Sequence, residues 1–133
     1  MFGEEVVPGA VIREIGERPG ELATVTSSGR VISQDPSNRP TVQALNVVLG
    51  AGESEAIVLA NEVGAYLLLT DDMRARRIAE GLGLKVVGTL GVIIRAWENG
   101  LIEDGPIVVS RLREEGLWVT DSVYQAALKK MNR

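Results

Sequence analysis

The apolar positions of the chain form stripes and short runs that alternate through its second half. A helix is predicted over residues 50–63, where four apolar side chains follow the i, i+3, i+4, i+7 spacing of an amphipathic helix: Ala56, Leu59, Ala60 and Val63. Gly64 follows as a typical helix stop. The next apolar run, residues 66–70, is continuous, which predicts a strand buried on both faces.

Helices and strands continue to alternate toward the C-terminus. The predicted segments are helices at 73–82, 90–98 and 107–115, a strand at 85–88 and a last helix capped by Thr120 or Asp121. Thr89 is a suitable cap for the helix at 90–98. Strands that alternate with helices indicate an α/β fold, with a parallel sheet that helices cover on both faces.

The first 49 residues carry a weaker pattern. Residues 6–7 predict a short strand that leads into a helix at 8–15, because proline is well placed in a first helical turn. Residues 31–32 resemble a second short strand. The rest of 17–40 is rich in turn-forming residues, so we expect a variable connection there.

Composition narrows the chemistry that the chain can perform. A length of 133 residues fits a single domain, 1–133, and 45% hydrophobic with 24% charged residues is typical of a globular protein. The chain has no cysteine and no histidine, which excludes disulfides, thiolate zinc sites, cysteine nucleophiles and histidine-based triads. Any catalysis must therefore use carboxylates, hydroxyls, lysine or arginine.

Charge and hydropathy bear on partners and location. The net charge of −4 means that contact with a nucleic acid would have to come from a local basic patch. No apolar run approaches the roughly 20 residues that cross a bilayer. The first residues are acidic where a secretory signal would be basic. We therefore expect a cytoplasmic protein with no membrane partner.

Two adjacent carboxylates, Asp71 and Asp72, directly follow the strand predicted at 66–70. In open α/β sheets, ligands bind at the carboxyl ends of the strands, so a functional acid is expected at this position. An aspartate before a helix is also a common N-cap, and that structural role is the alternative for either residue.

A second candidate acid is Glu53, near the start of the helix predicted at 50–63. On a helical wheel, Glu53 lies closer to the apolar stripe than Glu55 does, so we expect Glu53 to face inward and Glu55 to be solvated. A carboxylate on the buried side of a helix start needs either the free N–H groups of the first turn or a cation as its partner. Oxygen ligands without histidine or cysteine suit Mg²⁺ or Mn²⁺.

Three blocks of sequence then carry a family resemblance, supported by the opening residues 2–11 and the later residues 116–120. The blocks are residues 49–57, residues 67–72 with Arg74 and Arg77 downstream, and residues 87–92. In this order and spacing they resemble a PIN-like family of bacterial and archaeal proteins, predicted to bind nucleic acids and related to VapC-type toxins.

The resemblance implies a three-layer α/β/α fold in which acidic residues hold Mg²⁺ or Mn²⁺ for RNA cleavage. Carried over by position, the metal-binding and catalytic acids are Glu14, Glu53 and Asp72, with Asp71 as an auxiliary. Arg74 and Arg77 are the expected contacts for RNA phosphates. Arg76 and Lys85 are further basic candidates, and solvated helix charge is the alternative for all four.

Members of this family normally begin with a strand and helix that carry the first catalytic Asp, a segment that would precede Met1. The resemblance therefore implies a parallel sheet incomplete at the N-terminus, exposed sheet surface, and self-association into a homo-oligomer. It predicts weak or no cleavage by the 133 residues.

Three functions follow from these expectations. The first is a metal-dependent ribonuclease, the toxin of a toxin–antitoxin pair with an antitoxin protein as its partner. The second is a catalytically inactive nucleic-acid-binding or assembly module with the same fold. The third is another phosphate-processing α/β enzyme that uses Asp71 and Asp72, although the chain lacks a nucleophile-and-base motif to support it.

Overall fold

The structure is a computed structural model, which describes residues 5–16, 31–117 and 119–132. The chain divides into two compact units, the N-terminal unit Phe2–Val86 and the C-terminal unit Val87–Arg133. Short strands and helices alternate in the described residues, so the predicted α/β class is confirmed. The described strands form two small sheets of two strands each, β1 with β2 and β3 with β4.

The N-terminal unit begins with a strand, a helix and a parallel strand pair. Strand β1 (Glu5–Val7) leads directly into helix α1 (Gly9–Gly16), close to the bounds predicted from the sequence. Strand β2 (Val31–Ser33) pairs in parallel with β1, with Val6 opposite Ile32. The connection expected over 17–40 thus contains a paired strand, and its residues 17–30 lie outside the described part of the chain.

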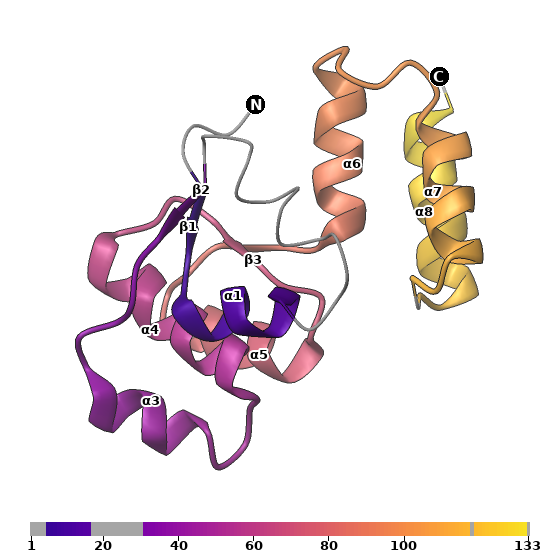
Figure 1. Cartoon of the computed structure of the whole chain (residues 1–133). Helices are drawn as coiled ribbons and strands as arrows, with labels where there is room; N and C mark the ends of the chain where they lie inside the picture. The colour runs from indigo at the N-terminus through magenta and orange to yellow at the C-terminus, as the bar shows by residue number, and fades with distance from the viewer. Residues whose placement is uncertain (1–4, 17–30, 118, 133) are drawn as a thin grey trace. The chain divides into compact units, whose positions relative to one another are not determined.

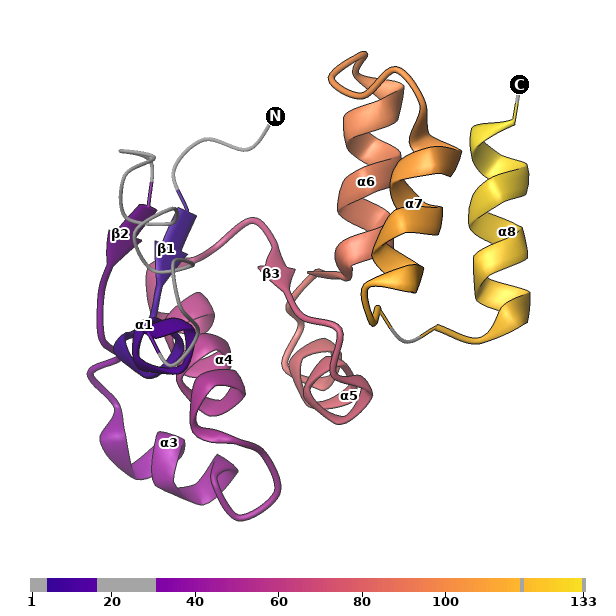
Figure 2. The same ribbon diagram turned by 45° about the vertical axis from the view of Figure 1, so that its right-hand side comes forward.

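Helix α4 (Ala51–Val63) is the central helix of the N-terminal unit. It packs against α1, against α3 (Arg39–Leu45) and against α5 (Met73–Gly81), and Figures 1 and 2 show these three helices around it. The core between these elements consists of Leu49, Ile57, Ala60, Leu68, Ala75 and Ala79. Gly64 ends α4 in the left-handed conformation that glycine tolerates, as predicted, with φ of 62°.

Helix α3 differs from the prediction, because the variable connection expected over 17–40 includes its first residues. In the structure Asn38 is the N-cap, and its side chain accepts a hydrogen bond from the Thr41 amide at 3.2 Å. Pro40 stands in the first turn, where its missing N–H costs nothing. The turn residues therefore begin a helix here.

The strand predicted at 66–70 is much shorter than expected. Strand β3 contains only Leu68–Leu69, and it pairs with β4 (Val86–Val87), with Leu68 N donating to Lys85 O at 2.8 Å. The prediction of burial on both faces is wrong, because Tyr66 is 70% and Leu69 60% exposed. Only Leu68 faces the core, so one side of this strand is covered.

The C-terminal unit is a group of three helices: α6 (Thr89–Glu98), α7 (Gly105–Glu114) and α8 (Asp121–Met131). Each packs against the other two around Ile93, Val109, Ala127 and Met131. Thr120, one of the two caps predicted for α8, accepts from the Val123 amide, whereas α6 has Gly88 as its N-cap in place of the expected Thr89. None of the described helices is long and apolar enough to span a bilayer.

Candidate functional site

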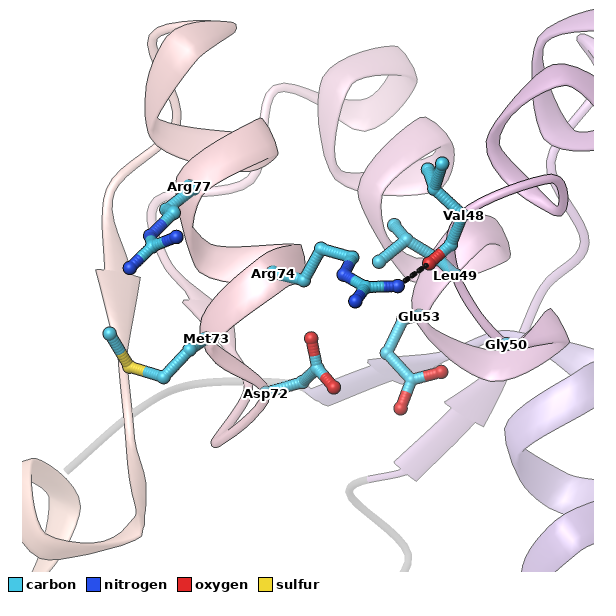
Figure 3. Close-up of a pocket in the computed structure, with 8 residues that line it drawn as sticks. All are labelled: Val48, Leu49, Gly50, Glu53, Asp72, Met73, Arg74 and Arg77. Atoms are coloured by element: carbon cyan, nitrogen blue, oxygen red, sulfur yellow. Dashed lines mark hydrogen bonds between the residues drawn. The ribbon is translucent and has the colours of Figure 1, made fainter.

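A cleft of about 640 Å³ opens in the N-terminal unit where α4 and α5 begin (Figure 3). We call it the acid–arginine cleft after its charged side chains. Its lining residues are Val48, Leu49, Gly50, Glu53, Asp72, Met73, Arg74 and Arg77. The cleft thus combines two acids and two arginines that the sequence had singled out.

Asp72 enters this cleft from the N-terminus of α5. It is the N-cap of the helix, and its Oδ1 accepts a hydrogen bond from the Ala75 amide at 2.7 Å. The capping role offered as the structural alternative is therefore present. The bond uses one carboxylate oxygen and leaves the other for a second partner.

Glu53 enters the cleft from the first turn of α4. Figure 3 shows its carboxylate and that of Asp72 facing the same space. Within the described ranges, no hydrogen bond or ion pair holds the Glu53 carboxylate. Glu53 is half-buried, and among the described residues its carboxylate has no protein partner, which favours binding of a cation.

Glu14 reaches the same helix start from α1. Its Oε1 accepts a hydrogen bond from the Gly52 amide at 3.1 Å, so Glu14, and not Glu53, takes up a free N–H of the first turn of α4. Glu14 and Glu53 together line a second cavity of about 220 Å³, with Thr70 and apolar side chains around them. Glu53 therefore has Asp72 beside it in one cavity and Glu14 in the other.

The two predicted phosphate contacts differ in their surroundings. Arg74 Nη1 donates to the Val48 carbonyl oxygen at 3.1 Å, a bond drawn in Figure 3 that holds the guanidinium over the cleft. Arg77 lies further along α5 and is exposed at the cleft wall. Asp71 is exposed, and it is not among the described residues that line either cavity.

The expectation that Glu55 is solvated is wrong. Glu55 is 2% exposed, whereas Glu53 is half-buried. The prediction assumed that α4 buries a single apolar stripe. In the structure, α4 packs against α1, α3 and α5, so it is buried on several sides. Glu55 faces α1 and α3, where the Ala10 amide and the Arg39 guanidinium bind it at 2.9 and 3.0 Å.

Two glycines at the start of α4 were not recognised as part of the site. A Cβ at Gly50 would lie 2.7 Å from Glu53 Oε2, and one at Gly52 would lie 2.7 Å from Glu14 Oε2. Both carboxylates therefore occupy space that a side chain would fill. The sequence signal was a helix start with glycines where a Ser, Thr, Asp or Asn cap is common.

The donor atoms at this site suit a hard divalent cation such as Mg²⁺ or Mn²⁺, because all are carboxylate oxygens. In the described part of the chain, however, no group of three or more acids lies close enough together to hold a metal ion. Glu14 and Asp72 each give one oxygen to a backbone amide. The residue types fit a metal, and Glu14 and Asp72 would each add their second carboxylate oxygen to those of Glu53 to hold one.

Comparison with known proteins adds a family to this geometry. A family model described as a PIN domain matches residues 1–133 of the chain. A search among curated proteins found no match. The matched range contains both units and every candidate acid and arginine.

Proposed function

Since the chain belongs to the PIN-domain family, we propose that it is a metal-dependent ribonuclease and the toxin of a toxin–antitoxin pair. The observation that carries the proposal is the Glu53 carboxylate, which has no partner in the described part of the chain and has Asp72 beside it in one cavity and Glu14 in the other. Acids near one another repel, and a cation relieves that repulsion.

Glu14, Glu53 and Asp72 are the residues that would hold Mg²⁺ or Mn²⁺, with Asp71 as an auxiliary acid at the same strand end. Such a cation would supply Lewis-acid stabilisation of the phosphate and a water with a lowered pKa. The chain itself would contribute phosphate binding through Arg74 and Arg77, which line the cleft beside the acids. These two arginines matter because the net charge of the chain is −4, so its overall charge does not attract RNA.

Phosphodiester cleavage depends on carboxylates held at ligand distance from a cation. Cation binding is less demanding, since Glu14 and Asp72 each give one carboxylate oxygen to a backbone amide. Binding and cleavage can therefore be measured separately.

The test is a thermal melt with and without Mn²⁺, followed by incubation with RNA. We expect Mn²⁺ to raise Tm in the wild type, because a ligand that binds only the folded state stabilises it. Glu53→Gln and Asp72→Asn should abolish the rise. Glu62→Gln is a matched control, since Glu62 is on the same helix and lines neither cavity among the described residues. A rise that persists in Glu53→Gln would contradict the proposed site.

A catalytically inactive binding module is the second candidate. It is favoured by the bonds that engage Glu14 and Asp72 with backbone amides and by the absence, among described residues, of a ready three-acid group. RNA binding that is lost in an Arg74→Ala, Arg77→Ala double variant, together with no Mn²⁺ effect on Tm, would favour this candidate. Metal-dependent cleavage of RNA that is lost in Asp72→Asn would support the ribonuclease and contradict the inactive module.

Self-association is a further part of the proposal, with an antitoxin protein as the other expected partner. Where the structure describes the chain, strands β1 and β2 pair with each other and with no third strand, and Val6 and Ile32 on them are 38% and 42% exposed. An open strand pair with exposed apolar residues favours pairing with another chain. Sedimentation velocity should show a species larger than the 14.3 kDa monomer, and a stable monomer at high concentration would contradict this part.

A further inference from the structure

Helices α1 and α4 each supply a carboxylate that bonds a backbone amide at the start of the other helix. Glu55 of α4 accepts a hydrogen bond from the Ala10 amide at the start of α1, at 2.9 Å. Glu14 of α1 accepts one from the Gly52 amide at the start of α4, at 3.1 Å. Each carboxylate satisfies a backbone N–H that has no partner inside its own helix, at the positive end of the helix dipole. The two bonds join the helices at two points in antiparallel order.

Gly52 is what lets Glu14 come so close. A Cβ at this position would lie 2.7 Å from Glu14 Oε2 and 2.9 Å from Oε1, nearer than such atoms approach one another in proteins. Gly52 is buried, so a side chain there could not turn away into solvent. Glycine is therefore required for the Glu14 carboxylate to occupy its present position.

Glu55 is the fixed end of this arrangement. Its carboxylate also accepts from Arg39 Nη1 at 3.0 Å and lies 3.8 Å from Arg13 Nη2. These partners neutralise a side chain that is only 3% exposed, while the two arginines are 52% and 70% exposed. A buried charge with several partners has little freedom to move, because leaving them exposes it to an apolar interior.

We propose that Gly52 and Glu55 are positioning residues for Glu14, and through it for the cation site; the second part rests on the proposed function. Glu55 fixes α1 against α4, and Gly52 provides both the space and the N–H that hold Glu14 Oε1. Held in this way, Glu14 lines one cavity together with Glu53. Residues that orient a ligand in this way typically change metal affinity about 10- to 100-fold when they are replaced.

The first experiment compares two glycine-to-alanine variants. Gly52→Ala should displace the Glu14 carboxylate and weaken Mn²⁺ binding about 10-fold or more, measured by titration calorimetry. The fold should persist because alanine is the better helix former. Gly81→Ala is the matched control: Gly81 is also in a helix, and a Cβ there would meet nothing within 4 Å. Equal Mn²⁺ affinity in both variants would overturn the proposal.

The second experiment needs no metal and separates this inference from the proposed function. The backbone amide signal of Gly52 in a ¹H–¹⁵N spectrum should move in Glu14→Gln, which weakens its acceptor, and in Glu55→Gln, which loosens α1. It should stay in place in Glu62→Gln, which alters a carboxylate on the same helix that binds Ser37 and Asn38 instead.

The two readouts fail in different ways. A wild-type chain that binds no Mn²⁺ contradicts the proposed function, and the Gly52 amide then decides the positioning role by itself. The inference is wrong if the Gly52 amide signal does not move in Glu55→Gln, or moves equally in Glu62→Gln. Either result would mean that the two hydrogen bonds between α1 and α4 do not position Glu14.

Discussion

In the N-terminal unit, carboxylates connect elements that are far apart in the sequence. Among its described residues, four carboxylates accept hydrogen bonds from backbone amides of other elements: Glu14, Asp35, Glu55 and Glu62. In the described part of the C-terminal unit, Asp104 caps the helix that it precedes, and Asp121 forms an exposed ion pair with Arg113. The helices there are joined by apolar side chains around Val109, which is fully buried.

This difference shows that the burial of an acidic side chain in the N-terminal unit does not by itself indicate a functional site. Glu55 is the most buried of the described acids, yet its partners account for it fully. Glu53, two residues earlier, is half-buried and has no partner among the described residues. Among carboxylates that hold the fold together, the one left unpaired is the better candidate for binding something else.

The largest effect is expected in the apolar C-terminal unit. Ile93→Ala should lower the free energy of unfolding by about 3 kcal/mol, because it removes a buried side chain and leaves a cavity. Urea unfolding followed by tryptophan fluorescence reports this unit, since both tryptophans follow residue 86. Ile107→Ala is the control, because Ile107 is 50% exposed. Similar losses in the two variants would contradict an apolar core at Ile93.

Glu55→Ala should follow, with a loss of about 2 kcal/mol measured by urea unfolding and circular dichroism. The variant leaves the Ala10 amide without its acceptor and removes the shared partner of Arg39 and Arg13. Glu53→Ala, on the same helix, should change stability by less than about 0.5 kcal/mol. If the two variants are equally destabilised, the contrast between the two acids does not hold.

A smaller loss, about 1 kcal/mol, is expected for Glu62→Ala. The exposed Glu62 carboxylate accepts from the Ser37 and Asn38 amides just before α3, at 2.9 and 2.7 Å. Water can replace part of this bonding at an exposed site. Hydrogen exchange should show faster exchange at these two amides, and unchanged exchange would show that Glu62 does not hold the start of α3.

The smallest effect belongs to the ion pair of the C-terminal unit. Asp121→Asn should lower stability by less than about 0.5 kcal/mol, because Asp121 is 82% exposed and its attraction to Arg113 is screened by solvent. Adding salt to the wild type should produce a change of the same size. A loss as large as that of Glu55→Ala would mean that polar contacts hold both units alike.

Patterns within one element could be predicted from the sequence. The glycine that ends α4 and the threonine that caps α8 depend on neighbouring residues only. The glycine was predicted correctly, and the threonine was one of two caps predicted for α8. The α/β class followed from the alternation of elements. These features need no knowledge of what packs against them.

Burial was harder to predict, because it depends on elements that are distant in the sequence. The burial of Glu55 depends on Ala10 and Arg39, which lie 45 and 16 positions away. The exposure of Tyr66 and Leu69 reflects the limited cover around a two-residue strand. In the candidate site, Glu53 and Asp72 line one cleft. The position of Glu14 near them depends on its hydrogen bond to the Gly52 amide, 38 positions away in the sequence.

That last separation bears on the order in which contacts form during folding. The bonds between α1 and α4 span 38 and 45 positions, so they can close only after a long part of the chain has been brought together. Contacts of this range slow folding and form after local helices do. An isolated α4 peptide would therefore contain Glu53 and the Gly52 amide but not the environment that they share with Glu14. The candidate site therefore depends on contacts that local helix formation does not supply, and an isolated helix would leave its acids apart.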